Sequence, residues 1–379
     1  MMKKCVIPIL AGCLLLTGCS GLKNIQDLTY IVSIGMDYDE KTKEYTAYLQ
    51  GLNFANVAKL EGVKPSENIP PFIASATGET LNLAVSKLYK MSEPPLFFGH
   101  VNTLVLTKNI IKDHFKDVIE EVGRNRSLRH TLIVMTTEEK LKDIFSINAL
   151  FNYPSVYSIL YKYNENELYE DELKPITLMD FLRVYFEPMG VAKLPSVKID
   201  SASWKEKKDY PVLYFDGFEV FQQQKYIDFI PFKDAILLNW LLEKNMVIDR
   251  KVERDGKVVA AVKLSSPKMK VKYEKGTSFP KFTIDVSARV DVLEKMEDIP
   301  IKELQGLVEE EIGNKCKAIF NKGIEHKADV FNVGDKWYRK HSKNYKNIKT
   351  AKSFYLDHGS LKSIKVEVKV FHFNSYKYN

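Results

Sequence analysis

The residues of this chain whose types and spacing point most directly to chemistry stand at its start, in the motif Leu16-Thr17-Gly18-Cys19. The motif follows Lys3-Lys4 and an apolar run at 5–16, which is shorter than the roughly 20 apolar residues of a membrane-spanning helix. A positive end, a short apolar segment and small residues before a cleavage point are typical of an export signal. Because a cysteine stands at that point, we expect acylation of the Cys19 thiol, with Cys19 as the first residue of the mature chain.

Residues 1–18 are then a lipoprotein signal peptide, and membrane lipid is contacted through the acylated Cys19. Each buried methylene contributes about 0.8 kcal/mol, and more than one acyl chain is needed for stable anchoring. A second motif, Leu10-Ala11-Gly12-Cys13, competes as the cleavage site, but its use would shorten the apolar segment and leave residues 14–16 on the mature chain. An ordinary signal peptide and an uncleaved apolar anchor are the remaining interpretations.

Composition and charge limit what the exported part can be. The chain has 379 residues, which is enough after removal of the signal for two or three domains with separate cores. The net charge of +7 falls to +5 without Lys3 and Lys4, and no dense basic block is present, which argues against nucleic acid as a partner. Cys316 alone is left with a free thiol, so we expect no internal disulfide, and its helical spacing predicts burial.

Histidines are the first candidates for catalysis, and none stands in a catalytic pattern. His100 follows Phe98-Gly99, but no nucleophile in a sharp glycine-flanked turn accompanies it, so a structural histidine at a strand entry is favoured. Gly123 and Gly190 stand alone, which excludes a glycine-rich phosphate loop. We therefore expect no enzyme activity, no cofactor and no metal. The other histidines lack the spacing of a zinc site: His114, His130, His326, His341, His358 and His372.

Two further groups of residues have a functional and a structural interpretation. Asp37, Asp39 and Glu40 are acidic enough for calcium, but they lack the glycine and the distal glutamate of a calcium loop, so turn chemistry is favoured. The segment 153–169 is rich in aromatic residues and offers a surface for a partner. Aromatic side chains at such positions are more often part of a core, which is the interpretation we favour.

Hydrophobic periodicity predicts alternating strands and helices over 19–200, an α/β region with room for two subdomains. Strands at 28–34 and 44–54 are expected to pair through a turn at 35–39. Thr136 with Glu139 fits a capping box for a helix that ends near Ile144. The other expected elements are helices at 80–91, 110–122 and 177–186 and strands at 96–106 and 128–135.

The polar residues 201–211 show no periodicity, and we interpret them as a linker to a C-terminal α+β domain at 212–379. That domain should begin with a hairpin around Gln222-Gln223-Gln224 and continue with an antiparallel meander and a long helix. The whole chain is therefore expected to have a multidomain α+β fold with mixed sheets and packed helices. The expected C-terminal helices are 232–244 and 300–320, and the expected strands are 212–221, 225–230, 246–252, 257–264, 268–273, 281–293 and 363–373.

Five features follow one another along the chain: the motif ending in Cys19, Gly35-Met36-Asp37, Phe98-Gly99-His100, Asp216-Gly217-Phe218-Glu219-Val220-Phe221, and the stretch 329–337. Together they resemble the Ger(x)C family of spore germination lipoproteins. The similarity runs over nearly the whole chain and depends on order and spacing, although Ser20 departs from the bulky aromatic residue usual after the acylated cysteine.

The resemblance implies a C-type subunit of a nutrient germinant receptor, required for nutrient-triggered germination. Such a subunit is expected on the outer face of the spore inner membrane, beside two integral-membrane partners of A type and B type, and direct nutrient binding stays open. The alternative is a lipid-anchored solute-binding protein of a transporter, which needs two similar α/β lobes around a cleft. The strand-rich C-terminal half differs from the N-terminal half, which argues against this alternative.

Overall fold

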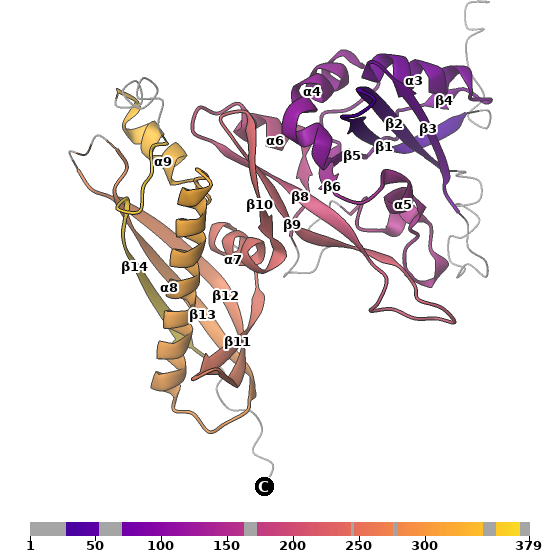
Figure 1. The fold of residues 1–379 in the computed structure, drawn as a ribbon. Coiled ribbons are helices and arrows are strands. Elements are labelled where there is room, and N and C mark those ends of the chain that lie inside the picture. The colour runs from indigo at the N-terminus through magenta and orange to yellow at the C-terminus, as the bar shows by residue number, and fades with distance from the viewer. Residues whose placement is uncertain are drawn as a thin grey trace, which may run out of the picture.

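The computed structural model describes residues 28–52, 70–162, 173–243, 246–275, 277, 279–343 and 354–371. These residues form two sheets with packed helices, one of ten strands and one of four, which confirms the expected α+β fold with mixed sheets (Figure 1). The two sheets are covered by different helices, and a helix lies between them. The position of each functional residue is set by one of these layers.

The ten-stranded sheet is mixed, with the order β10-β9-β8-β6-β5-β1-β2-β3, while β4 pairs with β1 and β7 with β6. Four pairs are parallel: β1 with β5, β5 with β6, β6 with β8, and β1 with β4. The other pairs of this sheet are antiparallel. Its strands are β1 (Thr29–Asp39), β2 (Glu44–Leu52), β3 (Phe72–Gly78), β4 (Leu96–Phe97), β5 (Thr103–Thr107), β6 (Ile133–Thr137), β7 (Ile176–Thr177), β8 (Val191–Asp200), β9 (Val212–Gln222) and β10 (Lys225–Pro231).

Helices cover the ten-stranded sheet because their apolar stripes face its alternating apolar residues. The helices are α3 (Leu81–Lys90), a π-helical turn (Ile110–His114) leading into α4 (Phe115–Arg124), α5 (Leu141–Ser146) and α6 (Leu178–Tyr185). Thr80 caps α3 by accepting a hydrogen bond from the Leu83 amide, and Thr177 caps α6 through the Asp180 amide. The core beneath α4 and α6 is aromatic: Phe115, Phe181 and Phe221 have ring centroids 5.3 to 5.4 Å apart.

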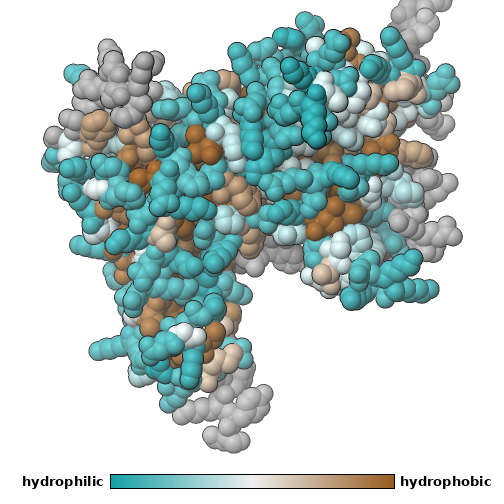
Figure 2. Space-filling view, in the orientation of Figure 1, coloured by the Kyte–Doolittle hydropathy of each residue, from teal (hydrophilic) through white to brown (hydrophobic). Residues whose placement is uncertain are grey.

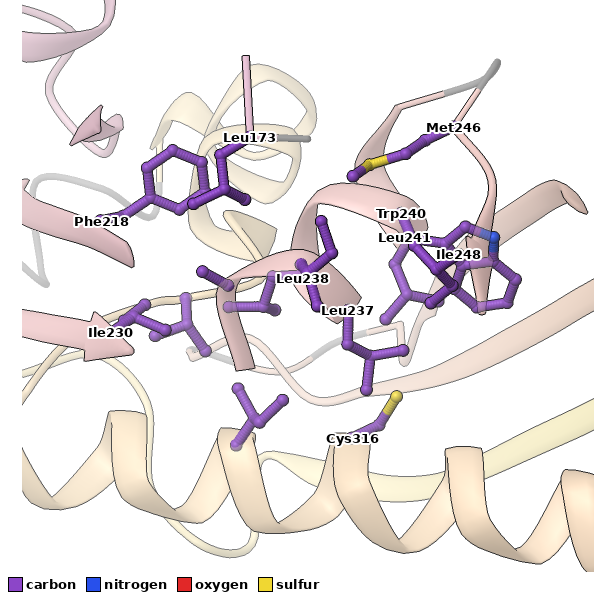
Figure 3. Close-up of a cluster of buried hydrophobic side chains, with 14 of the residues drawn as sticks. Leu173, Phe218, Ile230, Leu237, Leu238, Trp240, Leu241, Met246, Ile248 and Cys316 are labelled. Carbon is purple, nitrogen blue, oxygen red and sulfur yellow. The ribbon is translucent and has the colours of Figure 1, made fainter. Parts of the chain in front are cut away.

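The four-stranded sheet has the order β11-β12-β13-β14 and is covered by the long helix α8. Its elements are β11 (Ile248–Arg254), β12 (Lys257–Tyr273), β13 (Phe282–Lys295), α8 (Ile301–Glu325), α9 (Val333–Lys340) and β14 (Leu361–Val370). Between the two sheets lies α7 (Phe232–Leu242), which contacts β9 and β10 on one side and β11 and β12 on the other (Figure 1). Trp240 and Cys316 are fully buried there, and Figure 3 shows Cys316 on the side of α8 that faces α7.

The structure differs from the sequence expectations at several elements, each for a physical reason. The β1 strand continues to Asp39 because 35–39 pair with β2, so the turn lies at 40–43. The expected capping box at Thr136 is wrong, because Thr136 belongs to β6 and α5 begins only at Leu141. The last strand, β14, pairs with β13 in parallel, so the sheet extends the confirmed meander of β11, β12 and β13.

Residues 201–211, expected to be a linker, connect two strands of one sheet. The β8 and β9 strands pair antiparallel on either side of this segment, from Asp200 with Val212 to Val191 with Gln222. The expected C-terminal region therefore contributes β9 and β10 to the ten-stranded sheet. The division of the chain into domains stays a prediction, and the pairing shows that strands on both sides of residues 201–211 share one sheet.

Candidate functional site

The expected acylation site, Cys19, lies outside the described residues. The position at which the chain enters the sheet is nevertheless defined by Thr29. Its amide donates a 3.0 Å hydrogen bond to the Pro95 carbonyl, and its hydroxyl donates a 3.2 Å bond to the Pro94 carbonyl. Because Thr29 also pairs with Leu96 of β4, the chain enters beside β4 at the start of β1.

His100 lies among aromatic rings close to this entry point. Its ring centroid is 5.3 Å from that of Tyr30 and 5.6 Å from that of Phe97. These contacts give the imidazole a packing role just before β5, which supports the structural interpretation of this residue. In the described ranges, no three His, Cys, Asp or Glu side chains are grouped as a metal ion requires.

Two acidic residues at the other end of β1, Asp37 and Asp39, accept hydrogen bonds from protein groups. Oδ1 of Asp37 accepts a 2.6 Å bond from the Thr107 hydroxyl at the end of β5. Oδ1 of Asp39 accepts a 2.7 Å bond from the amide of Lys41, and Glu40 is exposed. Asp39 therefore has the expected turn role, whereas Asp37 is a strand residue that bonds across the sheet to β5.

The aromatic segment 153–169 divides between surface and core. Tyr157 is 55 % exposed and packs against the Tyr153 ring at 5.5 Å, whereas the Tyr161 hydroxyl accepts a 2.7 Å bond from Ser33 in β1 and donates to the side chain of Gln50 in β2. Burial raises the pKa of Tyr161 above its usual range. Tyr163 and Tyr169 lie outside the described residues. Tyr161 therefore belongs to a buried network, and Tyr157 is the surface residue of the pair.

Three charged side chains, Lys108, Glu138 and Glu219, lie together where β5 and β6 end beside β9. The Lys108 ammonium follows β5, forms an ion pair with Glu138 after β6, and lies 3.8 Å from Oε1 of Glu219. Glu219 is only 1 % exposed, and its Oε2 is buried without a hydrogen-bond partner. Burial raises the pKa of Glu219 to about 7, and the nearby Lys108 charge opposes that rise. The Glu219 carboxyl therefore changes charge near neutral pH.

A second group of polar side chains joins the ten-stranded sheet to the C-terminal segments, and we call Lys193, Gln222, Asp329 and Tyr355 the junction cluster. The amide of Gln222 donates a 2.7 Å bond to the Tyr355 hydroxyl, which donates a 2.9 Å bond to Oδ2 of Asp329. Oε1 of Gln222 accepts a 2.9 Å bond from the Asp329 amide. Lys193 donates a 3.3 Å bond to the Val330 carbonyl. The cluster therefore ties β8 and β9 to the chain on both sides of α9.

The Asp329 carboxylate in the junction cluster is buried and also orders the start of α9. It accepts bonds of 3.0 Å and 2.6 Å from the amides of Val333 and Gly334. Burial raises the pKa of Asp329, while these amides and the Tyr355 hydroxyl oppose the rise. Burial has the opposite effect on a cation, and it lowers the pKa of Lys193 to about 8. All four members hold protein groups in place, so the cluster acts as a structural joint.

Sequence reasoning missed most of this joint. The sequence marks Asp329 only as part of the stretch 329–337 that resembles the family, and Lys193 and Tyr355 carry no local signal. The expected turn at Gln222 is wrong, because Gln222 ends β9 and follows Phe218 and Val220 at every second position of the strand. A polar residue at an inward-facing position of an alternating strand is the signal that identifies it.

Comparisons with known proteins match almost the entire chain. The family model described as "Spore germination protein N-terminal domain" matches residues 21–199, and the one described as "Spore germination B3/ GerAC like, C-terminal" matches residues 216–372. The chain belongs to the Ger(x)C family. It is thus a germination-related protein, and the boundary between the two models falls in the β8–β9 hairpin.

Other Ger(x)C proteins align with this chain at low identity. Spore germination protein KC of Bacillus subtilis is 22 % identical over 92 % of this chain and 91 % of that protein. GerQC of Bacillus cereus is 20 % identical over 86 % of this chain and 88 % of that protein. The crystal structure of the GerBC protein is similar with a TM-score of 0.53 and 14 % identity, covering 92 % of this chain and all of that one, which shows a shared fold.

The names of these Ger(x)C relatives are those of spore germination proteins, and none is the name of an enzyme. Every helix in the described part of this chain is too short or too polar to cross a bilayer. Even the 25-residue α8 carries charged residues along its length.

Proposed function

We propose that this chain is the non-catalytic, lipid-anchored C-type subunit of a nutrient germinant receptor. It acts on the outer face of the spore inner membrane, beside integral-membrane subunits of A type and B type. The observation that carries the proposal is the family match, which spans residues 21–372 in two models. The motif ending in Cys19 supports the anchor, since it precedes the first matched residue by only two positions.

The described side chains support a non-catalytic role. The buried ionisable groups of the junction cluster bond to backbone amides and carbonyls and to one another. Glu219 of β9 is 1 % exposed and lies 3.8 Å from the Lys108 ammonium. The cluster groups therefore hold protein segments together, and no described group in this set presents a paired nucleophile and base to a substrate.

The solute-binding alternative is not favoured by the architecture. A two-lobed binding protein closes two similar α/β lobes around its solute. Here one sheet has ten strands in mixed order and the other has four, and α7 is packed between them. We infer that the chain supports assembly with membrane partners and couples nutrient detection to germination.

The test is germination of spores that lack the gene, carry the unaltered gene, or carry Cys19→Ala. Loss of optical density is followed over a panel of amino acids and sugars, in a strain without redundant receptors. Deletion is expected to slow the response to particular nutrients and to leave the response to non-nutrient agents normal. Cys19→Ala should give a partial defect, because loss of the anchor lowers the local concentration of the protein at its partners. Normal responses of the deleted strain to every nutrient would contradict the proposal.

A further inference from the structure

The two ends of β1 differ in the surface that surrounds them. At the Asp39 end the side chains around the turn are charged and exposed, from Asp39 to Lys43. At the Thr29 end, large apolar side chains are exposed on neighbouring elements. We call Phe72, Tyr89, Met91 and Phe97 the entry rim, because they surround the point at which the chain enters the sheet. Their exposed fractions are 70 %, 49 %, 67 % and 38 %.

Strand register and helix direction bring the entry rim together. Phe97 of β4 pairs with Tyr30 of β1, and Phe72 opens β3 opposite Gly51 at the end of β2. The α3 helix starts near Gly78 at the far end of β3 and returns, so Met91 follows its last turn at the Phe72 end. The rim residues therefore lie at the same end of the strands, the Thr29 end of β1, although they are up to 25 positions apart in sequence.

The entry rim has the composition of a surface that meets a membrane interface. Aromatic residues and methionine fill the boundary between headgroups and acyl chains, and lysines beside them contact phosphates. Lys90 lies in the last turn of α3 with Glu93 as the opposing charge nearby, whereas the Lys87 ammonium donates a 2.6 Å bond to the Thr77 carbonyl. Figure 2 shows hydrophobic surface among hydrophilic side chains at the upper right, where α3 and β4 lie.

The length of the preceding chain favours a bilayer as the occupant. Ten positions separate Cys19 from Thr29, and a fully extended chain of that length reaches at most about 35 Å. If Cys19 carries the acyl chains, the start of β1 is held within that distance of the lipid surface. Apolar side chains exposed at that end would be buried by the interface, whereas the charged Asp39 end points away from it.

We propose that the entry rim is a lipid-binding surface that seats the protein on the membrane with the start of β1 toward the bilayer. This inference rests on the proposed anchoring of Cys19, and it adds an orientation to it. The rim buries its apolar side chains at the headgroup boundary, while the acyl chains supply the stable attachment. The junction cluster and the four-stranded sheet are then farther from the lipid than the rim.

Depth-dependent quenching tests this orientation with the acylated full-length protein. The chain is incorporated into vesicles of phosphatidylcholine and phosphatidylglycerol whose acyl chains are brominated, and tryptophan emission is compared with unbrominated vesicles. The probes are Met91→Trp and Phe72→Trp, each measured against the parent protein with its natural tryptophans. Leu83→Trp, 49 % exposed on the first half of α3, and Met296→Trp, 53 % exposed after β13, are the controls.

Met91→Trp and Phe72→Trp are expected to lose much of their added emission and to shift it to shorter wavelength. Leu83→Trp should lose less, and Met296→Trp should be unaffected. An unquenched Met91→Trp in protein that still floats with the vesicles would overturn the orientation and leave the anchor intact. Protein that does not float would instead refute the anchor. Quenching that requires the integral partner subunits would assign the rim to a protein contact and overturn the lipid-binding role.

Discussion

The side-chain amide of Gln222 donates a 2.7 Å hydrogen bond to the hydroxyl of Tyr355, a residue 133 positions further along the chain. Gln222 ends β9 in the ten-stranded sheet, and Tyr355 lies between α9 and β14. Both side chains are buried, at 3 % and 2 % exposure. This bond therefore links the ten-stranded sheet to the segment between α9 and β14 through two buried side chains.

Removal of the Tyr355 hydroxyl should destabilise the protein. In Tyr355→Phe, the Gln222 amide loses its acceptor and Asp329 loses a donor, while both stay buried. A buried polar group without a partner costs about 1–3 kcal/mol, so the free energy of unfolding should fall by that amount. Urea unfolding followed by circular dichroism measures it. Tyr157→Phe, on a ring that is 55 % exposed, is the control and should change little. Equal stability of the two variants would contradict the role of the cluster.

Gly217 in β9 should not tolerate a side chain. Its φ is +156°, and an added Cβ would lie 2.1 Å from the Ile230 carbonyl oxygen of β10. Gly217→Ala is expected to lower the free energy of unfolding by at least about 1–3 kcal/mol. Gly306→Ala is the matched control, because open space surrounds that helical glycine in α8 and alanine there should add about 0.5–1 kcal/mol. Thermal unfolding of both variants checks the opposite signs.

The buried Glu219 should make stability depend on pH. Its pKa in the folded protein is about 7, raised by burial from 4.5, so the folded state binds more protons than the unfolded state between those values. Stability therefore falls as the pH rises from about 4.5 to about 7, and Glu219→Gln should remove that loss. The variant should gain stability relative to the parent between pH 4 and pH 8, by roughly 3 kcal/mol at most.

Glu138 offers the control of opposite sign for this experiment. Its hydrogen bond with Lys108 lowers its pKa, so its contribution is present near neutral pH and is lost as the pH falls. Because the Glu138 side chain is 47 % exposed, Glu138→Gln should cost only about 0–1 kcal/mol near pH 7. Urea unfolding at several pH values distinguishes the two carboxylates. A flat difference between Glu219→Gln and the parent would contradict the burial argument.

The thiol of Cys316 should be unreactive in the folded protein. It is fully buried under α7, and burial raises its pKa to about 12, so almost no thiolate forms at neutral pH. A thiol reagent should label the native protein very slowly and the urea-unfolded protein at once. Mass spectrometry counts the labels. Rapid labelling without denaturant would show that α8 separates from α7 in solution.

Local periodicity determined much of the secondary structure and the burial of particular residues. The apolar stripe at 300–320 placed α8 and put Cys316 on its buried side, because helical spacing alone decides which residues share a face. The β9 and β10 hairpin and the helix α3, with its break before Pro94-Pro95, likewise followed from short-range signals. The acylation motif is also a local signal, and its processing stays a prediction.

Tertiary structure alone decided how these elements pair. The strands expected at 257–264 and 268–273 form one strand, β12, because both segments pair with β13. A bulge separates the two segments, and Ser266 in it has a φ of +52°. Backbone pairing groups are the same in every residue, so sequence patterns do not specify that β14 lies parallel to β13 or that β9 adds to the N-terminal sheet. The junction cluster depends on residues more than 100 positions apart and forms only after these sheets meet.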